Sequence, residues 1–484
     1  MRTAMHHDRT SALGGTYADP ASATARIRFR RALTLAAMTL VMPGSAQLVQ
    51  GNKRVGRIAI RIWLGVLALV AVFVLLALMD RQLVFGLATN GALLSLGRWV
   101  LVGLAIGWVA LIVDAWRLGR PRELARPHLA ISTALHAGLV VATAAVLFVA
   151  AHTVSVMNGF TDTVFASNTV SKPHEGRYNV LLLGTDSGKD RDGMRPDSIN
   201  VASIDAETGK AVIIGLPRNL ENVPFPKGSV MREQFPNGFD CEGCYLNAVN
   251  TWANDNAKLF DSKEPGIDAT MGAVEEITGL KLNYYALVNM KGFSKLIDAV
   301  GGVRLNVRER TAIGGIGSPI RGYIEAGEQK LSGDKALWYA RSRVENDDWS
   351  RMGRQKCVMN AMVRQLNPQK VLMNMQDIAN SSSAMLHTSI PRQDLNVFMD
   401  LALKTKSQPI SSVSLVPPVI YTGNPDFDKV RRLVSSAVGT SEAREEVQKS
   451  ALVTAKLPLL EIGGEAQKKD PRKANRSADL NESC

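Results

Sequence analysis

Four charged residues, two aspartates and two arginines, stand at the ends of three predicted strands in the middle of the chain. The strands are residues 178–183, 199–204 and 211–216, and the charged residues are Asp186, Arg195, Asp197 and Arg218. Residues 205–209 are a hairpin signal between the second and third strands. If the first two strands are antiparallel neighbours, all four side chains fall at one end of a sheet. Two carboxylates beside arginines suit Mg²⁺ and phosphate, because Mg²⁺ takes one or two carboxylates and fills its other positions with water and phosphate oxygens.

A second cluster of charged and polar residues lies further along the chain. Its members are Arg341, Arg343, Asp347, Asp348, Arg351, Arg354 and Gln355. In an extended chain Arg341 and Arg343 point to the same face, where two guanidinium groups suit a pyrophosphate. The last three members share one face of a helix predicted over residues 349–366. A surface ion pair is the more common explanation for any one arginine, but the whole set favours a functional site.

Five stretches, in their order and spacing, resemble the LytR-CpsA-Psr (LCP) family. They are residues 179–187, 195–198, 215–219, 293–303 and 327–355, within a resemblance that covers residues 178–366. The fourth ends in Val-Gly-Gly-Val, and in the fifth Leu-Ser-Gly-Asp-Lys-Ala-Leu leads into Ala-Arg-Ser-Arg. The form Leu-Pro-Arg-Asn-Leu-Glu-Asn-Val-Pro at residues 216–224 is similar to the actinobacterial branch of the family.

The resemblance implies a phosphotransferase attached to the plasma membrane. Such enzymes move a glycopolymer from a polyprenyl pyrophosphate carrier to peptidoglycan, and an apolar pocket holds the polyprenyl tail. By position, Asp186 and Asp197 would hold Mg²⁺, and Asp348 would be the catalytic base, with Asp347 as the alternative. The pyrophosphate-binding residues would be Arg195, Arg218, Arg341 and Arg343, supported by Arg351, Arg354 and Gln355; Arg341 and Arg343 would also act in catalysis.

Elementary chemistry is consistent with this expectation. Phosphoryl transfer depends mostly on positioning and on neutralising charge, and a hydroxyl acceptor needs a base to take its proton. Two alternatives use the same residues: a polyprenyl-pyrophosphate hydrolase, and a non-catalytic protein that binds or regulates the cell wall. The three aspartates argue against pure anion binding, because carboxylates repel anions. The sequence departs from the common LCP pattern at Trp349-Ser350, where Phe-Gly is usual.

Three segments of the N-terminal third are long and apolar enough to cross a membrane. They are residues 58–79, 96–116 and 129–151, each near the ~20 residues that a spanning helix needs. Arginine and lysine concentrate at residues 26–31, 53–57 and 117–126, and basic residues stay cytoplasmic. Three spans with a cytoplasmic N-terminus satisfy this rule and place everything after His152 outside. A weaker segment, residues 32–49, is interrupted by Pro-Gly-Ser; we expect it to be re-entrant or interfacial, with a four-span arrangement as the alternative.

The predicted fold is α/β: a multi-helix transmembrane region and an extracytoplasmic α-β-α domain with a mixed central sheet, the LCP fold. The expected parts are a cytoplasmic tail (1–31), a membrane region (32–152), a stalk (153–173), the catalytic domain (174–440) and a polar, largely disordered tail (441–484).

The chain has 484 residues and a formal net charge of +13, but no nucleic-acid-binding signature. Part of this charge flanks the membrane segments, and the rest would suit an anionic partner. All four cysteines lie outside in this topology, where disulfides persist. We expect Cys241 to pair with Cys244, and Cys357 with Cys484.

Overall fold

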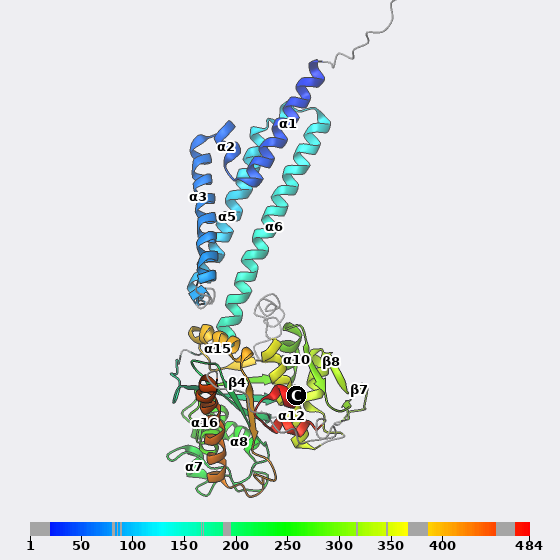
Figure 1. The fold of residues 1–484 in the computed structure, drawn as a ribbon. Helices are drawn as coiled ribbons and strands as arrows, with labels where there is room; N and C mark the ends of the chain where they lie inside the picture. The colour runs from blue at the N-terminus through cyan, green and yellow to red at the C-terminus, as the bar shows by residue number, and fades with distance from the viewer. Residues whose placement is uncertain are drawn as a thin grey trace, which may run out of the picture. The chain divides into compact units, whose positions relative to one another are not determined.

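The protein is described by a computed structural model that covers residues 20–79, 83–84, 86–87, 90–165, 167, 169–186, 195–315, 318–344, 347–365, 386–451 and 470–484. It divides into two compact units (Figure 1). The first comprises Met1–Val84 and Leu94–Ser155, and the second comprises Phe85–Leu93 and Val156–Cys484. Each unit is described by itself below.

The first unit is helical. Its helices are α1 (Pro20–Val41), α2 (Ser45–Gln50), α3 (Lys53–Met79), most of α5 (Gly91–Leu118), the short η1 (Pro121–Glu123) and the first part of α6 (Arg126–Val164). Three of the described helical segments are long and apolar enough to cross a membrane: Lys53–Met79, Gly91–Glu123 and Arg126–Val164. They contain the three predicted segments, which confirms three candidate spans. Because α6 ends at Val164, the expected stalk begins as helix.

The weaker segment, residues 32–49, divides between α1 and α2 at Pro43-Gly44. Gly44 has a φ of +94°, and a Cβ added there would lie 2.6 Å from the Cβ of Ala59 on α3. The buried Gln47 side chain donates to the Leu111 carbonyl (3.0 Å) and to Asp114 (3.1 Å), both on α5. Residues 32–49 therefore pack against other helices of this unit, and their re-entrant or interfacial character stays a prediction.

The second unit is built on a seven-stranded mixed sheet with strand order β11-β10-β3-β2-β1-β4-β9. The strands are β1 (Arg177–Thr185), β2 (Pro196–Asp205), β3 (Ala211–Leu216), β4 (Tyr284–Asn289), β9 (Leu386–Thr388), β10 (Ile410–Ser414) and β11 (Arg476–Ser477). β1 pairs antiparallel with β2 and parallel with β4, and β3 pairs antiparallel with β2 and parallel with β10. The predicted mixed sheet and the hairpin at residues 205–209 are both confirmed.

Helices cover both faces of this sheet. Alternate strand residues such as Leu181 and Ile214 pack with α9 (Pro265–Thr278) and α16 (Phe427–Ala451) on one face. Leu182 and Ile213 pack with α12 (Asp348–Gln365) on the other. The remaining helices of the unit are α7 (Val230–Gln234), α8 (Val249–Asp255), α10 (Met290–Ala299), α11 (Gly333–Arg341), α15 (Leu395–Ser407), α17 (Leu480–Ser483) and the short η2 (Leu246–Ala248), η3 (Ala257–Leu259), η5 (Arg392–Asp394) and η7 (Pro471–Asn475). The unit is therefore the expected α-β-α sandwich.

Two small hairpin sheets extend the unit beside α12. They pair β5 (Val303–Val307) with β8 (Gly327–Leu331), and β6 (Thr311–Ile313) with β7 (Gly322–Ile324). Their apolar residues form a second core with α10, α11 and α12. In Figure 1, β7 and β8 lie on the far side of α12 from α16.

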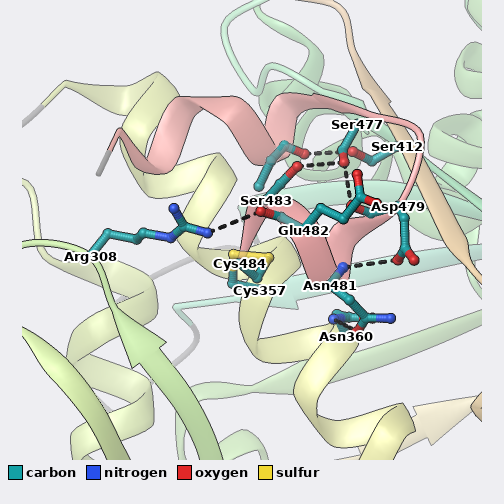
Figure 2. The surroundings of a disulfide bond; sticks show 11 residues. Arg308, Cys357, Asn360, Ser412, Ser477, Asp479, Asn481, Glu482, Ser483 and Cys484 are labelled. Carbon is teal, nitrogen blue, oxygen red and sulfur yellow. Dashed lines mark hydrogen bonds between the residues drawn. A yellow bond between two sulfur atoms is a disulfide. The ribbon is translucent and has the colours of Figure 1, made fainter. Parts of the chain in front are cut away.

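The expectation of a largely disordered tail at residues 441–484 is wrong where the structure describes the segment. α16 continues to Ala451, and residues 470–484 form η7, β11 and α17. β11 pairs antiparallel with β10 at the edge of the sheet, and Ala474 and Leu480 are fully buried. Cys484 forms the predicted disulfide with Cys357 of α12, with a Cα–Cα distance of 5.3 Å (Figure 2). A few buried contacts, an edge strand and a covalent tether thus order a sequence whose composition is polar.

Candidate active site

The four charged residues predicted at strand ends do meet at one end of the sheet. Thr185 at the end of β1 pairs with Pro196 at the start of β2, and Ile199 of β2 pairs with Leu216 at the end of β3. This register brings Asp186, Arg195, Asp197 and Arg218 to a common cavity of about 540 Å³. Arg218 also donates to Asp197 in a short charged hydrogen bond.

Much of the lining of the same cavity is apolar. Side chains from β1, β4, α10, α11, α12 and β9 line it: Leu182, Ala286, Leu287, Val288, Met290, Phe293, Leu296, Leu337, Met359, Met362 and Leu386. The cavity therefore has a charged end and an apolar wall, which suits a ligand with an anionic head and a hydrocarbon tail.

Arg341 and Arg343 both line the charged end, although not as the extended pair that we expected. Arg341 is the last residue of α11, and Ser342 after it is extended. The Arg341 guanidinium lies over the Trp338 ring, 4.8 Å from its centroid, which orients it by a cation–π contact. The turn at the end of α11, rather than strand alternation, brings the two arginines to one cavity.

Asp348 joins two of the cavity arginines. Its Oδ2 accepts from Arg351 Nη2 (2.9 Å), and its Oδ1 lies 3.8 Å from Arg343 Nη1. That Oδ1 is buried and accepts no hydrogen bond from any residue in the described ranges. Burial lowers the pKa of Arg351, while nearby Asp348 opposes this effect and Arg218 adds to it. Asp348 thus lies between two arginines of the cavity, and one of its oxygens has no hydrogen-bond donor among the described residues.

The side chain of Asp347, the alternative base, makes contacts that stabilise the local structure. Its Oδ1 accepts from the Ser350 backbone N–H (2.7 Å), which is the contact of an N-cap at the first turn of α12. Its Oδ2 lies 3.9 Å from Arg472 Nη1. It does not line the cavity. Asp348 is not a lining residue either, but unlike Asp347 it contacts two of the lining arginines, so Asp348 remains the predicted base.

Gln355 lines the cavity, whereas Arg354 does not. Gln355 accepts from Ser198 Oγ (3.0 Å) and donates to the Ala340 carbonyl (3.2 Å). Arg354 is 1% exposed and donates to the Tyr339 carbonyl (2.8 Å) and to the Ser342 carbonyl. Burial lowers its pKa, with Tyr339 and Glu309 opposing that effect. The structure does not place Arg354 at the cavity with the other predicted pyrophosphate ligands: its side chain binds two carbonyls at the end of α11, next to Arg341 and Arg343.

Some cavity residues were not among the predicted site residues. Ser198 and Asn200 belong to β2, and Asn200 donates to Ser198 Oγ (3.0 Å). Asn247 also lines the cavity, and its backbone N–H donates to the Arg218 carbonyl (3.0 Å). Ser198 stood in a quoted motif, but no sequence pattern marked Asn247.

The carboxylates of the cavity fit a magnesium ion better than a metal held by protein ligands alone. Asp186 and Asp197 are the two carboxylates among the lining residues. Within the described ranges, no group of three or more His, Cys, Asp or Glu side chains could hold a metal ion. Mg²⁺ is commonly bound by one or two carboxylates together with substrate phosphates, so this donor set fits it.

Comparison with known proteins finds relatives whose names refer to the synthesis of the cell wall. The chain is 30% identical over 189 residues to the polyisoprenyl-teichoic acid–peptidoglycan teichoic acid transferase TagU of Bacillus mycoides, covering 38% of this chain and 51% of that protein. It is 26% identical over 221 residues to the cell wall biosynthesis protein LcpA of Corynebacterium glutamicum, covering 41% and 42%. The structure of TagV from B. subtilis matches with 22% identity and a TM-score of 0.40, covering 55% of this chain and 98% of that one.

The chain spans about half the length of the curated relatives it matches first. The sequence profile described as the LytR_cpsA_psr family matches residues 149–428, which is more than half of the chain. The matched region contains both halves of the cavity and all of the predicted site residues. The protein belongs to the LytR_cpsA_psr family.

Proposed function

We propose that this protein is a membrane-anchored phosphotransferase that moves a cell-wall glycopolymer from a polyprenyl pyrophosphate carrier to peptidoglycan. One observation carries the proposal: a single cavity joins an apolar wall to a cluster of arginines and aspartates. A polyprenyl pyrophosphate has the same division into hydrocarbon and anion. The names of the TagU relatives describe transfer of a lipid-linked polymer to peptidoglycan.

The arginines of the cavity would hold the pyrophosphate. Arg195, Arg218, Arg341, Arg343 and Arg351 all line its charged end. Guanidinium groups bind phosphate oxygens bidentately, and several around one pyrophosphate neutralise the charge that develops on the leaving group. Gln355, whose amide is fixed between Ser198 and the Ala340 carbonyl, lines the same space.

Asp348 would act as the base for the acceptor. A peptidoglycan sugar hydroxyl would lose its proton as its oxygen attacks the phosphorus that carries the glycopolymer, and the Asp348 carboxylate would take that proton. Arg343 and Arg351 keep this carboxylate in place. The products are a phosphodiester to peptidoglycan and polyprenyl phosphate.

Asp186 and Asp197 would hold Mg²⁺. When bound, the ion would neutralise charge on the phosphate oxygens. The described pairing of Asp197 with Arg218 keeps that carboxylate at the charged end of the cavity.

The anchor would place the enzyme beside its donor. The three basic clusters of the N-terminal third favour a cytoplasmic N-terminus and an extracytoplasmic second unit, with the plasma membrane crossed three times. A lipid-linked donor and a wall acceptor are both available on that side.

The experiment uses the full chain in nanodiscs, a polyprenyl-pyrophosphate oligosaccharide, peptidoglycan fragments and Mg²⁺. We expect a glycan–peptidoglycan phosphodiester, detected by mass spectrometry. Arg343→Ala should abolish the product, whereas Arg310→Ala, an exposed arginine outside the cavity lining, should retain it. Full activity of Arg343→Ala would refute the site assignment. Phosphate release that needs no acceptor, without the coupled product, would instead identify a hydrolase.

A further inference from the structure

Residues 470–484, here called the strap, run along the side of α12 that faces away from the cavity. Helix α12 lines the cavity through Arg351, Gln355, Met359 and Met362. The strap contacts other positions of the same helix. Asn481 accepts from Asn360 (3.0 Å), Asp479 lies 3.9 Å from Arg364, and Cys484 is bonded to Cys357. Figure 2 shows these last residues of the strap gathered around the disulfide.

The first part of the strap contacts the first turn of α12. Asn475, which is 3% exposed, donates from Nδ2 to the Trp349 carbonyl (2.8 Å). Arg472 Nη1 lies 3.9 Å from Asp347 Oδ2. These contacts fall on the residues immediately before and after Asp348, whose own side chain turns toward Arg343 and Arg351.

Two buried side chains, Ser414 and Lys356, hold Asn475 in place through hydrogen bonds. Its Oδ1 accepts from Ser414 Oγ (2.9 Å) on β10, and Ser414 accepts from the fully buried Lys356 of α12. A chain of hydrogen bonds therefore leads from the middle of α12, through the sheet and the strap, back to the helix start. The Oδ1 and Nδ2 atoms of Asn475 each have a partner, so the Asn475 amide cannot rotate without leaving a buried polar group unpaired.

We propose that the strap positions Asp348 for the transfer reaction, and that Asn475 is the positioning residue. This inference rests on the proposed function for its kinetic consequence. The Trp349 carbonyl fixed by Asn475 and the Asp347 cap paired with Arg472 set the rotation of the first turn, and that rotation sets the distance from Asp348 Oδ1 to the acceptor hydroxyl. A displacement of about 1 Å at a reacting group can cost roughly 100-fold in rate.

The test compares Asn475→Asp with Asn481→Ala in the full chain. Asn475→Asp keeps the side-chain volume and the acceptor for Ser414 but removes the donor to Trp349. We expect its kcat to fall roughly 10- to 100-fold while the KM for the lipid pyrophosphate changes less than about two-fold. Asn481→Ala loosens the strap at the other end of α12 and should leave kcat within about two-fold of the unaltered protein. An equal loss of kcat in both variants, or none in Asn475→Asp, would overturn the proposal.

A second variant and a second measurement, hydrogen exchange, distinguish a loss of positioning from misfolding. Arg472→Gln changes a half-exposed side chain, removes the ion pairs to Asp347 and to Asp470 within the strap, and should lower kcat by a few-fold in the same direction. Hydrogen exchange of the backbone at residues 347–353 should be faster in Asn475→Asp than in Asn481→Ala. Unchanged exchange there would refute the strap proposal on its own. Absence of transfer by the unaltered protein would refute the proposed function instead, because the exchange comparison does not require turnover.

Discussion

Lys356 is a lysine buried in the middle of α12, and replacing it should stabilise the protein in a pH-dependent way. Its side chain is 0% exposed, and its ammonium donates to Ser414. Burial lowers its pKa from 10.5 to about 7, and no charged partner in the described part of the chain opposes this effect. A cation without a carboxylate beside it in a packed interior carries an uncompensated loss of hydration.

The sign follows from proton binding in the two states. Below pH 7 the lysine is protonated in both the folded and the unfolded chain, so its contribution to stability does not change with pH. Between pH 7 and 10.5 only the unfolded chain holds the proton, so the free energy of unfolding rises with pH by about 1.4 kcal/mol per pH unit. Over that interval the contribution is about 5 kcal/mol. At neutral pH the buried lysine therefore lowers the free energy of unfolding by about this amount, and a methionine at the same position would not.

Lys356→Met should therefore be more stable than the unaltered protein by about 4 kcal/mol at pH 7, after about 1 kcal/mol for the lost hydrogen bond. The advantage should shrink to about 1 kcal/mol at pH 9. At roughly 2 °C per kcal/mol, the melting temperature of the full chain in detergent should rise by about 8 °C at pH 7. Lys281→Met, at an exposed lysine paired with Glu275 (2.9 Å), is the control and should change it by less than about 2 °C. A stability difference for Lys356→Met that does not vary between pH 6 and 9 would refute the reasoning.

Three further predictions concern the reaction and the membrane. Asp348→Asn should lower kcat by 10²- to 10⁴-fold with donor binding retained, whereas Asp347→Asn, which keeps an N-cap acceptor but loses the ion pair with Arg472, should lower kcat by only a few-fold; equal kinetic losses would contradict the assignment of the base. Chelation by EDTA should stop transfer and added Mg²⁺ should restore it, and Asp197→Asn should raise the Mg²⁺ concentration needed for half-maximal rate; EDTA-resistant transfer would exclude the metal. In intact cells a membrane-impermeant thiol reagent should label Lys227→Cys and should label Arg122→Cys only after permeabilisation, and the reverse pattern would invert the topology.

The strand ends could be predicted because local sequence decides them. The hairpin at residues 205–209 has its own turn chemistry, with Asp205 Oδ1 accepting from the Thr208 backbone (2.7 Å) and Gly209 at a φ of +75°. Once the antiparallel register follows from that hairpin and its neighbour, the side chains after β1 and before β2 must lie together. Pairing of the sheet then brings Asp186 and Asp197 to one cavity.

The contacts of the Arg354 side chain could not be predicted from its spacing along the helix. Successive helical residues advance by about 100°, so Arg354 and Gln355 diverge by that angle although both follow Arg351 within one turn. Which of them meets the cavity depends on what packs beside α12. The end of α11 takes the Arg354 guanidinium through two carbonyls, and Gln355 is left facing Ser198. A neighbour distant in sequence therefore decides the roles of adjacent residues.

The direction of α12 also decides how a lipid pyrophosphate can lie in the cavity. Along the helix, the lining residues change from Arg351 and Gln355 near its start to Met359 and Met362 near its end. These eleven steps of about 1.5 Å span roughly 16 Å, so one helix forms both the charged end and part of the apolar wall. The positive end of the helix dipole adds to the arginines at the same place. In the proposed function, a donor in the reverse orientation would bring hydrocarbon to the arginines and anion to the methionines, so the pyrophosphate would lie beside the start of α12, where Asp348 pairs with Arg343 and Arg351.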